Sequence, residues 1–163
     1  ARDLLVKNQI LAMEDARLTT IQHHASGEPY LLLPKAIQPL LHISISHSRT
    51  WCACLISLAA QPASIDLEDL SIQRDVLKLA EHFFSIQECE YVKNFGAEAF
   101  YILWTAKEAI AKLRGKGLAE VLKIQLHPAS LETNRVNFEG REYRLKRHIT
   151  QDYLYTIASQ GWK

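Results

Sequence analysis

The sequence has few cysteines, and their spacing excludes two classes of protein. Three cysteines occur among 163 residues, two of them only two positions apart in "WCACLIS". This pattern does not form a disulfide framework, and no further Cys/His pair completes a zinc site. We therefore expect Cys52, Cys54 and Cys89 to be small buried residues of a protein in a reducing cytoplasm.

Long apolar runs and a net charge are also missing. No stretch approaches the roughly 18–20 apolar residues of a membrane span, so we expect no membrane association. The first residues carry charges and lack the cleavage region of a signal peptide. A net charge of +1 gives no general reason to expect nucleic-acid binding, so any polyanion site must be a local cluster.

In the first part of the chain, hydrophobic spacing predicts a helix over residues 3–18. Prolines interrupt residues 26–41, which we expect to be irregular. Alternation predicts a strand over 42–46, then a turn ("SHSRT"), then a largely buried strand over 51–59. Residues 61–70 contain another short strand.

The second part mixes helices and strands. We expect a helix over 71–84, capped by Asp69 or Ser71, and a second helix that begins at the capping box of Ser85 and Glu88. The longest helix should end at Gly115, and a hairpin should turn near Gly140. The predicted strands are 121–127, 135–139, 142–149 and 152–159. Because helices and strands do not strictly alternate, the pattern indicates an α+β fold with antiparallel sheet.

Two acids in "SIDLED" are the first candidate functional residues. In a strand, Asp66 and Glu68 point to the same face, where they repel each other unless a positive charge lies between them. Magnesium is one solution, because it binds one or two carboxylates and leaves places for phosphate oxygens. The alternative is a solvated strand end with no function.

The second candidate lies in the long helix, in "YILWTAKEAIAK". Trp104, Glu108 and Lys112 form one stripe beside an apolar stripe that includes Ile102 and Ile110. An isolated glutamate four residues before a lysine favours a surface salt bridge worth about 0.2–0.5 kcal/mol. The large tryptophan on the same stripe favours a partly covered face instead.

The third candidate is "SISHSRTW". Ser46, His47, Ser48 and Arg49 offer hydrogen-bond donors in the predicted turn, which suits a phosphate. A polar loop that satisfies its own backbone is the alternative. A Ser–His–Asp hydrolase is excluded by the absence of a G-x-S-x-G motif.

The order of these motifs carries more information than any one of them. "GEPYL", "SISHSRTW", "SIDLED", "FFSIQE" and "WTAKEAIAKLRGKGL" follow one another and resemble the 4′-phosphopantetheinyl transferases of the larger, surfactin-synthetase-activating type. The resemblance covers residues 1–127 and is strongest from Ile43 to Leu118. It implies two pseudo-symmetric α+β halves, each a small antiparallel sheet with a long helix, around a central active-site cleft. We expect a shortened or incomplete N-terminal half over 1–61 and a C-terminal half with the metal site over 62–163.

The resemblance also implies an activity. Such an enzyme transfers the phosphopantetheine arm of coenzyme A to a serine of an apo acyl or peptidyl carrier protein. The reaction depends on Mg²⁺ and releases adenosine 3′,5′-bisphosphate. By motif position, Asp66, Glu68 and Glu108 would hold Mg²⁺, and Glu108 and Lys112 would be catalytic. The cofactor-binding residues would be Lys7, Ser46, His47, Arg49, Lys107 and Lys112.

One departure leaves an alternative open. The family's G-K-P is Gly27-Glu28-Pro29 here, so an acid stands where the family has a phosphate-binding lysine. A non-catalytic domain that binds coenzyme A or a carrier protein is therefore the second hypothesis. The resemblance implies a cytoplasmic monomer without nucleic-acid or membrane partners, with the carrier protein near Val76, Leu77 and Phe84.

Overall fold

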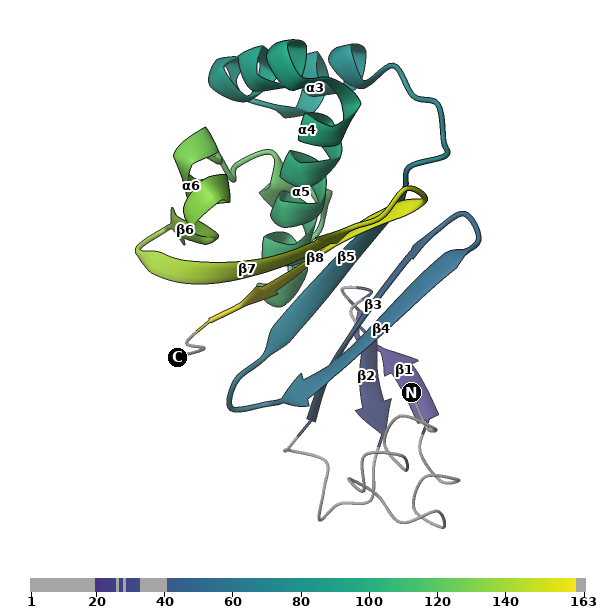
Figure 1. Cartoon of the computed structure of the whole chain (residues 1–163). Helices are drawn as coiled ribbons and strands as arrows, with labels where there is room; N and C mark the ends of the chain where they lie inside the picture. The colour runs from purple at the N-terminus through teal and green to yellow at the C-terminus, as the bar shows by residue number, and fades with distance from the viewer. Residues whose placement is uncertain (1–19, 26, 28, 33–40, 161–163) are drawn as a thin grey trace.

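The computed structural model of the protein describes residues 20–25, 27, 29–32 and 41–160 (Figure 1). The helix predicted over residues 3–18, Lys7 and Glu28 lie outside the described residues. No helix in these described ranges is long and apolar enough to cross a membrane.

Two antiparallel hairpins come first among the described residues. Strands β1 (Thr20–His23) and β2 (Pro29–Leu32) form one of them, although the second strand falls in a segment that we predicted to be irregular. Strands β3 (Leu41–Ser48) and β4 (Trp51–Leu58) form the other. The turn predicted over "SHSRT" was too long, because pairing with β4 continues as far as Ser48.

The exposure of β4 was also predicted wrongly. Its residues are exposed or half-buried, so Cys52 is exposed and Cys54 is partly exposed. Cys89 is also only half-buried. Among the described residues, β3 is the one strand that pairs with β4, so β4 has one unpaired edge there.

The C-terminal part is built on a four-stranded antiparallel sheet, which confirms the α+β class. Its strands are β5 (Ala63–Asp69), β6 (Arg135–Phe138), β7 (Arg141–Ile149) and β8 (Tyr153–Ser159), in the order β5-β8-β7-β6. The hairpin turns at Glu139 and Gly140, whose φ angles of 48° and 72° fit a tight two-residue turn.

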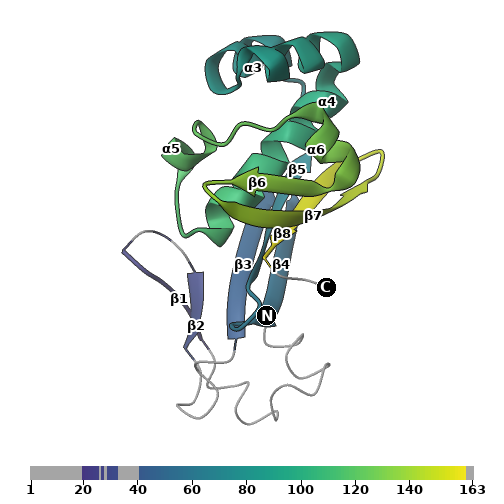
Figure 2. The same cartoon turned by 90° about the vertical axis from the view of Figure 1, so that its left-hand side faces the viewer.

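Helices cover this sheet (Figure 2). Helix α3 (Val76–Phe83) is capped by Asp75, not by the predicted Asp69 or Ser71. Helix α4 (Ile86–Leu113) begins at the predicted capping box of Ser85 and Glu88 and bends at Gly96. The predicted apolar stripe of α4 is confirmed, because Ile102, Ala106 and Ile110 are buried in the core.

The strand predicted over 121–127 is wrong. Helices α5 (Leu118–Val121) and α6 (Pro128–Thr133) flank an irregular stretch in which Ile124 and Leu126 are buried. The backbone N–H of Leu126 donates to Oε1 of Glu88 at 2.7 Å, so a side chain satisfies it instead of a neighbouring strand.

Serine side chains join the β3–β4 hairpin to the C-terminal sheet. Strand β3 lies beside β5, and Ser44 Oγ accepts a hydrogen bond from the N–H of Ile65 at 3.1 Å. Ser46 Oγ accepts one from the N–H of Leu67, also at 3.1 Å. We call this row of Ser44, Ser46 and Ser48 the serine seam. It brings β3 against the strand that carries Asp66 and Glu68.

Candidate active site

The acids and the lysine predicted from the sequence line one cavity. This cavity of about 420 Å³ lies between β3, β5 and α4. The predicted site residues in its walls are Ser46, His47, Asp66, Glu68, Glu108 and Lys112. The prediction that the Glu108–Lys112 stripe of α4 faces a cleft shared with the two acids of β5 is therefore confirmed.

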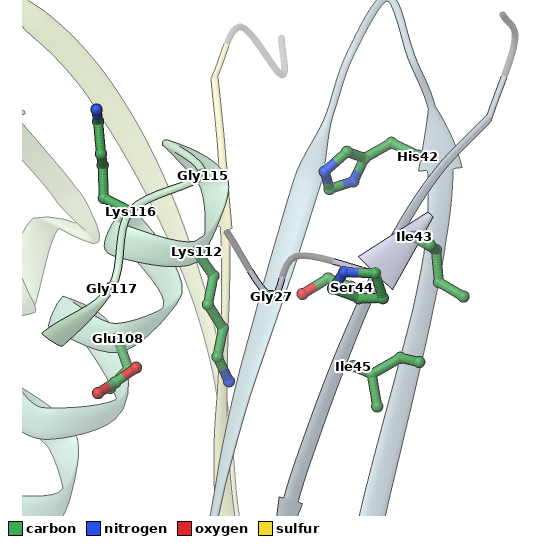
Figure 3. Close-up of a pocket in the computed structure, with 11 residues that line it drawn as sticks. Gly27, His42, Ile43, Ser44, Ile45, Glu108, Lys112, Gly115, Lys116 and Gly117 are labelled. Atoms are coloured by element: carbon green, nitrogen blue, oxygen red, sulfur yellow. The ribbon is translucent and has the colours of Figure 1, made fainter. Parts of the chain in front are cut away.

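A second cavity of about 240 Å³ adjoins the first (Figure 3). The two share Ile45, Glu108 and Lys112. The second is lined also by His42 and by the loop of residues 115–117 after α4. Gly115 in this loop has a φ of 63°, which favours glycine. An elongated ligand can therefore extend from the acids toward the end of α4.

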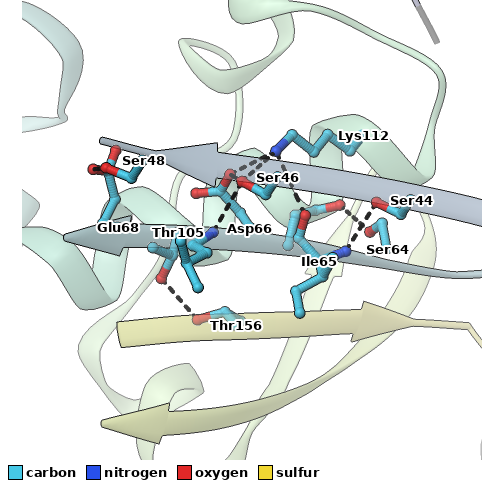
Figure 4. A network of polar contacts seen from close by, with 12 residues as sticks. Ser44, Ser46, Ser48, Ser64, Ile65, Asp66, Glu68, Thr105, Lys112 and Thr156 are labelled. Carbon is cyan, nitrogen blue, oxygen red and sulfur yellow. Dashed lines mark hydrogen bonds and ion pairs between the residues drawn. The ribbon is translucent and has the colours of Figure 1, made fainter. Parts of the chain in front are cut away.

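Asp66 is held firmly at one of its oxygens (Figure 4). Its Oδ1 accepts from Lys112 Nζ at 2.6 Å and from Ser46 Oγ at 2.9 Å. Its other oxygen, Oδ2, is buried without a hydrogen-bond partner. Burial raises the pKa of Asp66 although Lys112 and Ser46 act to lower it. A buried carboxylate with an unpaired oxygen is a group that an added cation would stabilise.

Glu68 is held in a similar way. Its Oε2 accepts from Ser48 Oγ at 2.8 Å and forms an ion pair with Arg74 Nη2 at 3.2 Å. Asp66 and Glu68 are thus each fixed by one serine of the seam and one cation. Sequence reasoning gave no role of this kind to Ser48 or Arg74. The i, i+2 spacing of the serines was an available signal for Ser48, since it places them on one face of a strand.

Glu108 completes the acidic wall from α4. Burial, followed by repulsion from Asp66, raises the pKa of Glu108 to about 7. At neutral pH this carboxyl therefore exchanges a proton readily, as a general base must.

The raised pKa of Glu108 predicts how stability depends on pH. Between the ordinary value of 4.5 and about 7, the folded protein keeps a proton that the unfolded chain releases. The free energy of unfolding therefore falls as the pH rises through this window. Glu108→Gln removes the charged form, so we expect the variant to melt at a higher temperature than the parent protein at about pH 8.

This advantage should disappear as the pH falls toward 4.5, where the parent side chain is also neutral. Thermal unfolding of both proteins, without added metal, across this range measures the difference. Glu90→Gln is the matched control, because Glu90 is exposed on the same helix. A stabilisation that is largest at acidic pH would contradict the prediction.

The donor set suits a hard divalent cation, although the side chains are not yet arranged around one. Within the described ranges, no group of three or more acidic, histidine or cysteine side chains is placed to hold a metal ion. The ammonium of Lys112 holds Asp66 instead, and the guanidinium of Arg74 holds Glu68. Carboxylate oxygens, one of them buried and unpaired, are the ligands that Mg²⁺ takes. The residues therefore fit the ion once the ammonium of Lys112 leaves Asp66.

The other predicted site residues lie in different places. His47 is exposed at the cavity, while Ser46 is buried in the seam. Arg49 is in the β3–β4 turn with a φ of 52°, and its Nη1 donates to Ser71 Oγ at 3.2 Å. Arg49 is absent from the walls of both cavities, so a role in ligand binding would require its side chain to move.

Lys107 requires a correction. We expected it to hold the cofactor, yet its side chain is only 1% exposed and its Nζ pairs with Glu88 Oε2 at 2.8 Å. The ammonium also lies 4.5 Å from the centre of the Phe84 ring. Successive residues of a helix point about 100° apart, so Lys107 faces the core while Glu108 faces the cavity. Lys107 is therefore placed to stabilise the fold.

This position predicts the effect of removing Lys107. Lys107→Met should lower the free energy of unfolding by about 3–5 kcal/mol, because Glu88 would remain buried without a counter-ion. Adding Glu88→Gln should recover only part of the loss: the amide oxygen can still accept from Leu126, but the amide nitrogen would face the N–H of Ser85, which Oε2 of Glu88 now accepts at 2.7 Å. Chemical denaturation measures both variants. If Lys107→Met instead kept its stability and lost ligand binding, Lys107 would belong to the site after all.

Comparisons with known proteins show similarity to one enzyme family. A family model described as "ACPS: 4′-phosphopantetheinyl transferase superfamily" matches residues 64–158. The chain is 40% identical over 84 residues to 4′-phosphopantetheinyl transferase gsp of Aneurinibacillus migulanus, across 48% of this chain and 33% of that protein. It is 33% identical over 138 residues to 4′-phosphopantetheinyl transferase Sfp of Bacillus subtilis, across 77% of this chain and 56% of Sfp.

A third relative matches over nearly the whole chain. The 4′-phosphopantetheinyl transferase ffp of Bacillus subtilis is 30% identical over 172 aligned residues, across 99% of this chain and 69% of that protein. The chain nevertheless spans only about half the length of Sfp and a third of gsp. The family match over residues 64–158 includes all three acids of the cavity wall and Lys112.

Proposed function

Because the chain belongs to the 4′-phosphopantetheinyl transferase superfamily and to its larger, surfactin-synthetase-activating type, we propose that it modifies carrier proteins. It transfers the 4′-phosphopantetheine arm of coenzyme A to a serine of an apo acyl or peptidyl carrier protein. Adenosine 3′,5′-bisphosphate is released. The observation that supports the proposal most is that Asp66, Glu68, Glu108 and Lys112 all line the same cavity.

The proposed step is a phosphoryl-type transfer. The serine oxygen of the carrier attacks the phosphorus that bears the pantetheine arm, and the bond to the departing nucleotide phosphate breaks. Such a transfer depends mainly on positioning and on charge neutralisation, so no protein nucleophile is needed. Mg²⁺ bound by Asp66, Glu68 and Glu108 would supply positive charge to the pyrophosphate.

The chain's own residues complete the reaction. Lys112 leaves Oδ1 of Asp66 and donates to a phosphate oxygen, where negative charge grows as the bond breaks. His47 donates to the same pyrophosphate from the end of β3, while Ser46 lines the cavity and keeps donating its one hydroxyl proton to Asp66. Glu108, whose pKa in the metal-free protein is raised to about 7, accepts the proton of the attacking serine.

The second cavity is the proposed site of the nucleotide portion. Lys116 is the cation in its wall besides Lys112, and the loop that carries it also contains Gly115 and Gly117. Glu28, which stands where the family has a lysine, lies outside the described residues. We propose that Lys116 supplies part of the positive charge that the family's lysine provides elsewhere.

The carrier protein is proposed to dock on α3. A groove of about 760 Å³ lies on this helix, with Leu79 and Phe83 among its lining and Lys78 at its edge. It occupies the region that the sequence indicated, although Val76, Leu77 and Phe84 are not in its walls. We also propose that the protein is a monomer and that it is located in the cytoplasm.

One experiment tests the proposed function. The protein is incubated with Mg²⁺, coenzyme A and a panel of apo carrier proteins, and each carrier is examined by mass spectrometry. We expect a carrier to gain the mass of one phosphopantetheine on its serine. Binding of coenzyme A without a mass gain on any carrier would overturn the proposal and favour a non-catalytic binding domain.

A further inference from the structure

Arg74 is the charged group at the candidate site that the proposed mechanism does not use. It lies between β5 and α3, and its Nη2 forms the 3.2 Å ion pair with Oε2 of Glu68. Its side chain is 31% exposed and also lines the groove on α3. Arg74 therefore reaches the acidic wall from the surface of the molecule.

The surroundings of Arg74 hold its side chain in place. The guanidinium carbon lies 5.9 Å from the centre of the Tyr101 ring, a geometry in which a cation and an aromatic face attract. Tyr101 itself is buried, and its hydroxyl donates to the carbonyl of Ile72 at 3.2 Å. The same aromatic residue thus fixes the segment that leads to Arg74 and supports the guanidinium.

The ion pair has two opposing effects on Glu68. Together with Ser48, Arg74 fixes Oε2 of Glu68 and so orients the carboxylate. Its positive charge also repels any cation that binds to the same carboxylate, and this repulsion is only partly screened at a site so little exposed. If Arg74 only orients Glu68, removing its charge will not raise the affinity of the protein for a cation.

We propose that Arg74 is a positioning residue that orients Glu68 and weakens cation binding to the acidic wall. The inference rests on the proposed function, because it takes Glu68 to be a ligand of the ion. Its consequence is that the cation binds poorly to the protein alone and well together with the pyrophosphate of coenzyme A, whose negative charges outweigh the guanidinium.

Binding of Mn²⁺, a spectroscopic substitute for Mg²⁺, tests this inference. The free Mn²⁺ signal in electron paramagnetic resonance is measured for the parent protein and for Arg74→Gln, with and without coenzyme A. We expect Arg74→Gln to bind Mn²⁺ alone about three- to tenfold more tightly. Arg74→Lys keeps the charge and should resemble the parent protein.

A matched control separates this effect from general surface charge. Lys78→Gln removes one positive charge from the same groove, but the ion-pair partner of Glu68 is Arg74. The Mn²⁺ affinity of this variant should stay within about twofold of that of the parent protein. If Arg74→Gln does not fold, Arg74→Met retains the apolar stem over Tyr101 and replaces it in the test. Steady-state transfer should also show a lower kcat for Arg74→Gln at saturating Mg²⁺, because Glu68 is less well oriented.

The outcomes are distinguishable. Unchanged or weaker Mn²⁺ binding by Arg74→Gln, or equal tightening by Lys78→Gln, would overturn the role of Arg74 while the proposed function stands. If the parent protein bound no Mn²⁺ even with coenzyme A, the proposed function and this inference would both be overturned.

Discussion

Glu108→Gln should lower the rate of phosphopantetheine transfer by about three orders of magnitude. The amide has nearly the same shape as the acid, but it carries no negative charge and cannot accept the proton of the attacking serine. Burial and the charge of Asp66 raise the pKa of this carboxyl to about 7, so the parent side chain can accept that proton near neutral pH. The variant should be inactive while melting at least as high as the parent protein above neutral pH.

Transfer is followed by mass spectrometry of an apo carrier protein over time, and coenzyme A binding is measured by calorimetry. The control is again Glu90→Gln, since Glu90 is an exposed glutamate of the same helix. It should keep the parental rate. Normal transfer together with normal coenzyme A binding by Glu108→Gln would remove this residue from the mechanism.

Lys112→Gln should lower the transfer rate by about 10²–10³-fold, the usual loss when one charged donor to a developing oxyanion is removed. Lys112 Nζ is 2.6 Å from Oδ1 of Asp66 and 3.1 Å from Ser46 Oγ, so it lies at the centre of the polar network. Glutamine can donate a hydrogen bond there but supplies no positive charge to the departing phosphate.

The same variant should not lose the cation. Without the ammonium, Asp66 has no competing ion pair, so Mn²⁺ binding to the protein should be retained or tightened. Retained metal binding with slow transfer distinguishes a catalytic lysine from one that only assembles the site. Lys123→Gln is the control, because Lys123 is 66% exposed and outside both cavities. A parental transfer rate in Lys112→Gln would contradict the proposed role.

Sequence patterns predicted the parts of the site that depend on local geometry. A strand places alternate residues on one face, which predicted that Asp66 and Glu68 act together. The spacing of Glu108 and Lys112 predicted a shared helix face, and the capping box of Ser85 and Glu88 predicted where α4 begins. Each of these follows from neighbours within one turn or two strand positions.

Contacts between distant segments were not predictable in this way. Lys107 pairs with Glu88, 19 positions earlier in the chain, and a local pattern does not show which side of the helix will meet that partner. Arg74 is only six positions from Glu68, but residues 70–75 belong to no helix or strand, so no periodic pattern predicts that the two side chains meet. Residues 121–127 alternate like a strand, but the position opposite Leu126 is occupied by the carboxylate of Glu88.

The serine seam links the architecture of the protein to its chemistry. Strands that pair through backbone hydrogen bonds do not need particular side chains. Here, by contrast, one hydroxyl, that of Ser46, accepts from the backbone N–H of Leu67 and donates to Asp66. Docking of the β3–β4 hairpin and alignment of the acids are therefore a single cooperative event. A molecule whose hairpin opens locally would keep its C-terminal sheet and helices, but Asp66 and Glu68 would then be held by Lys112 and Arg74 alone. Closure of this hairpin thus completes the hydrogen bonding of both acids.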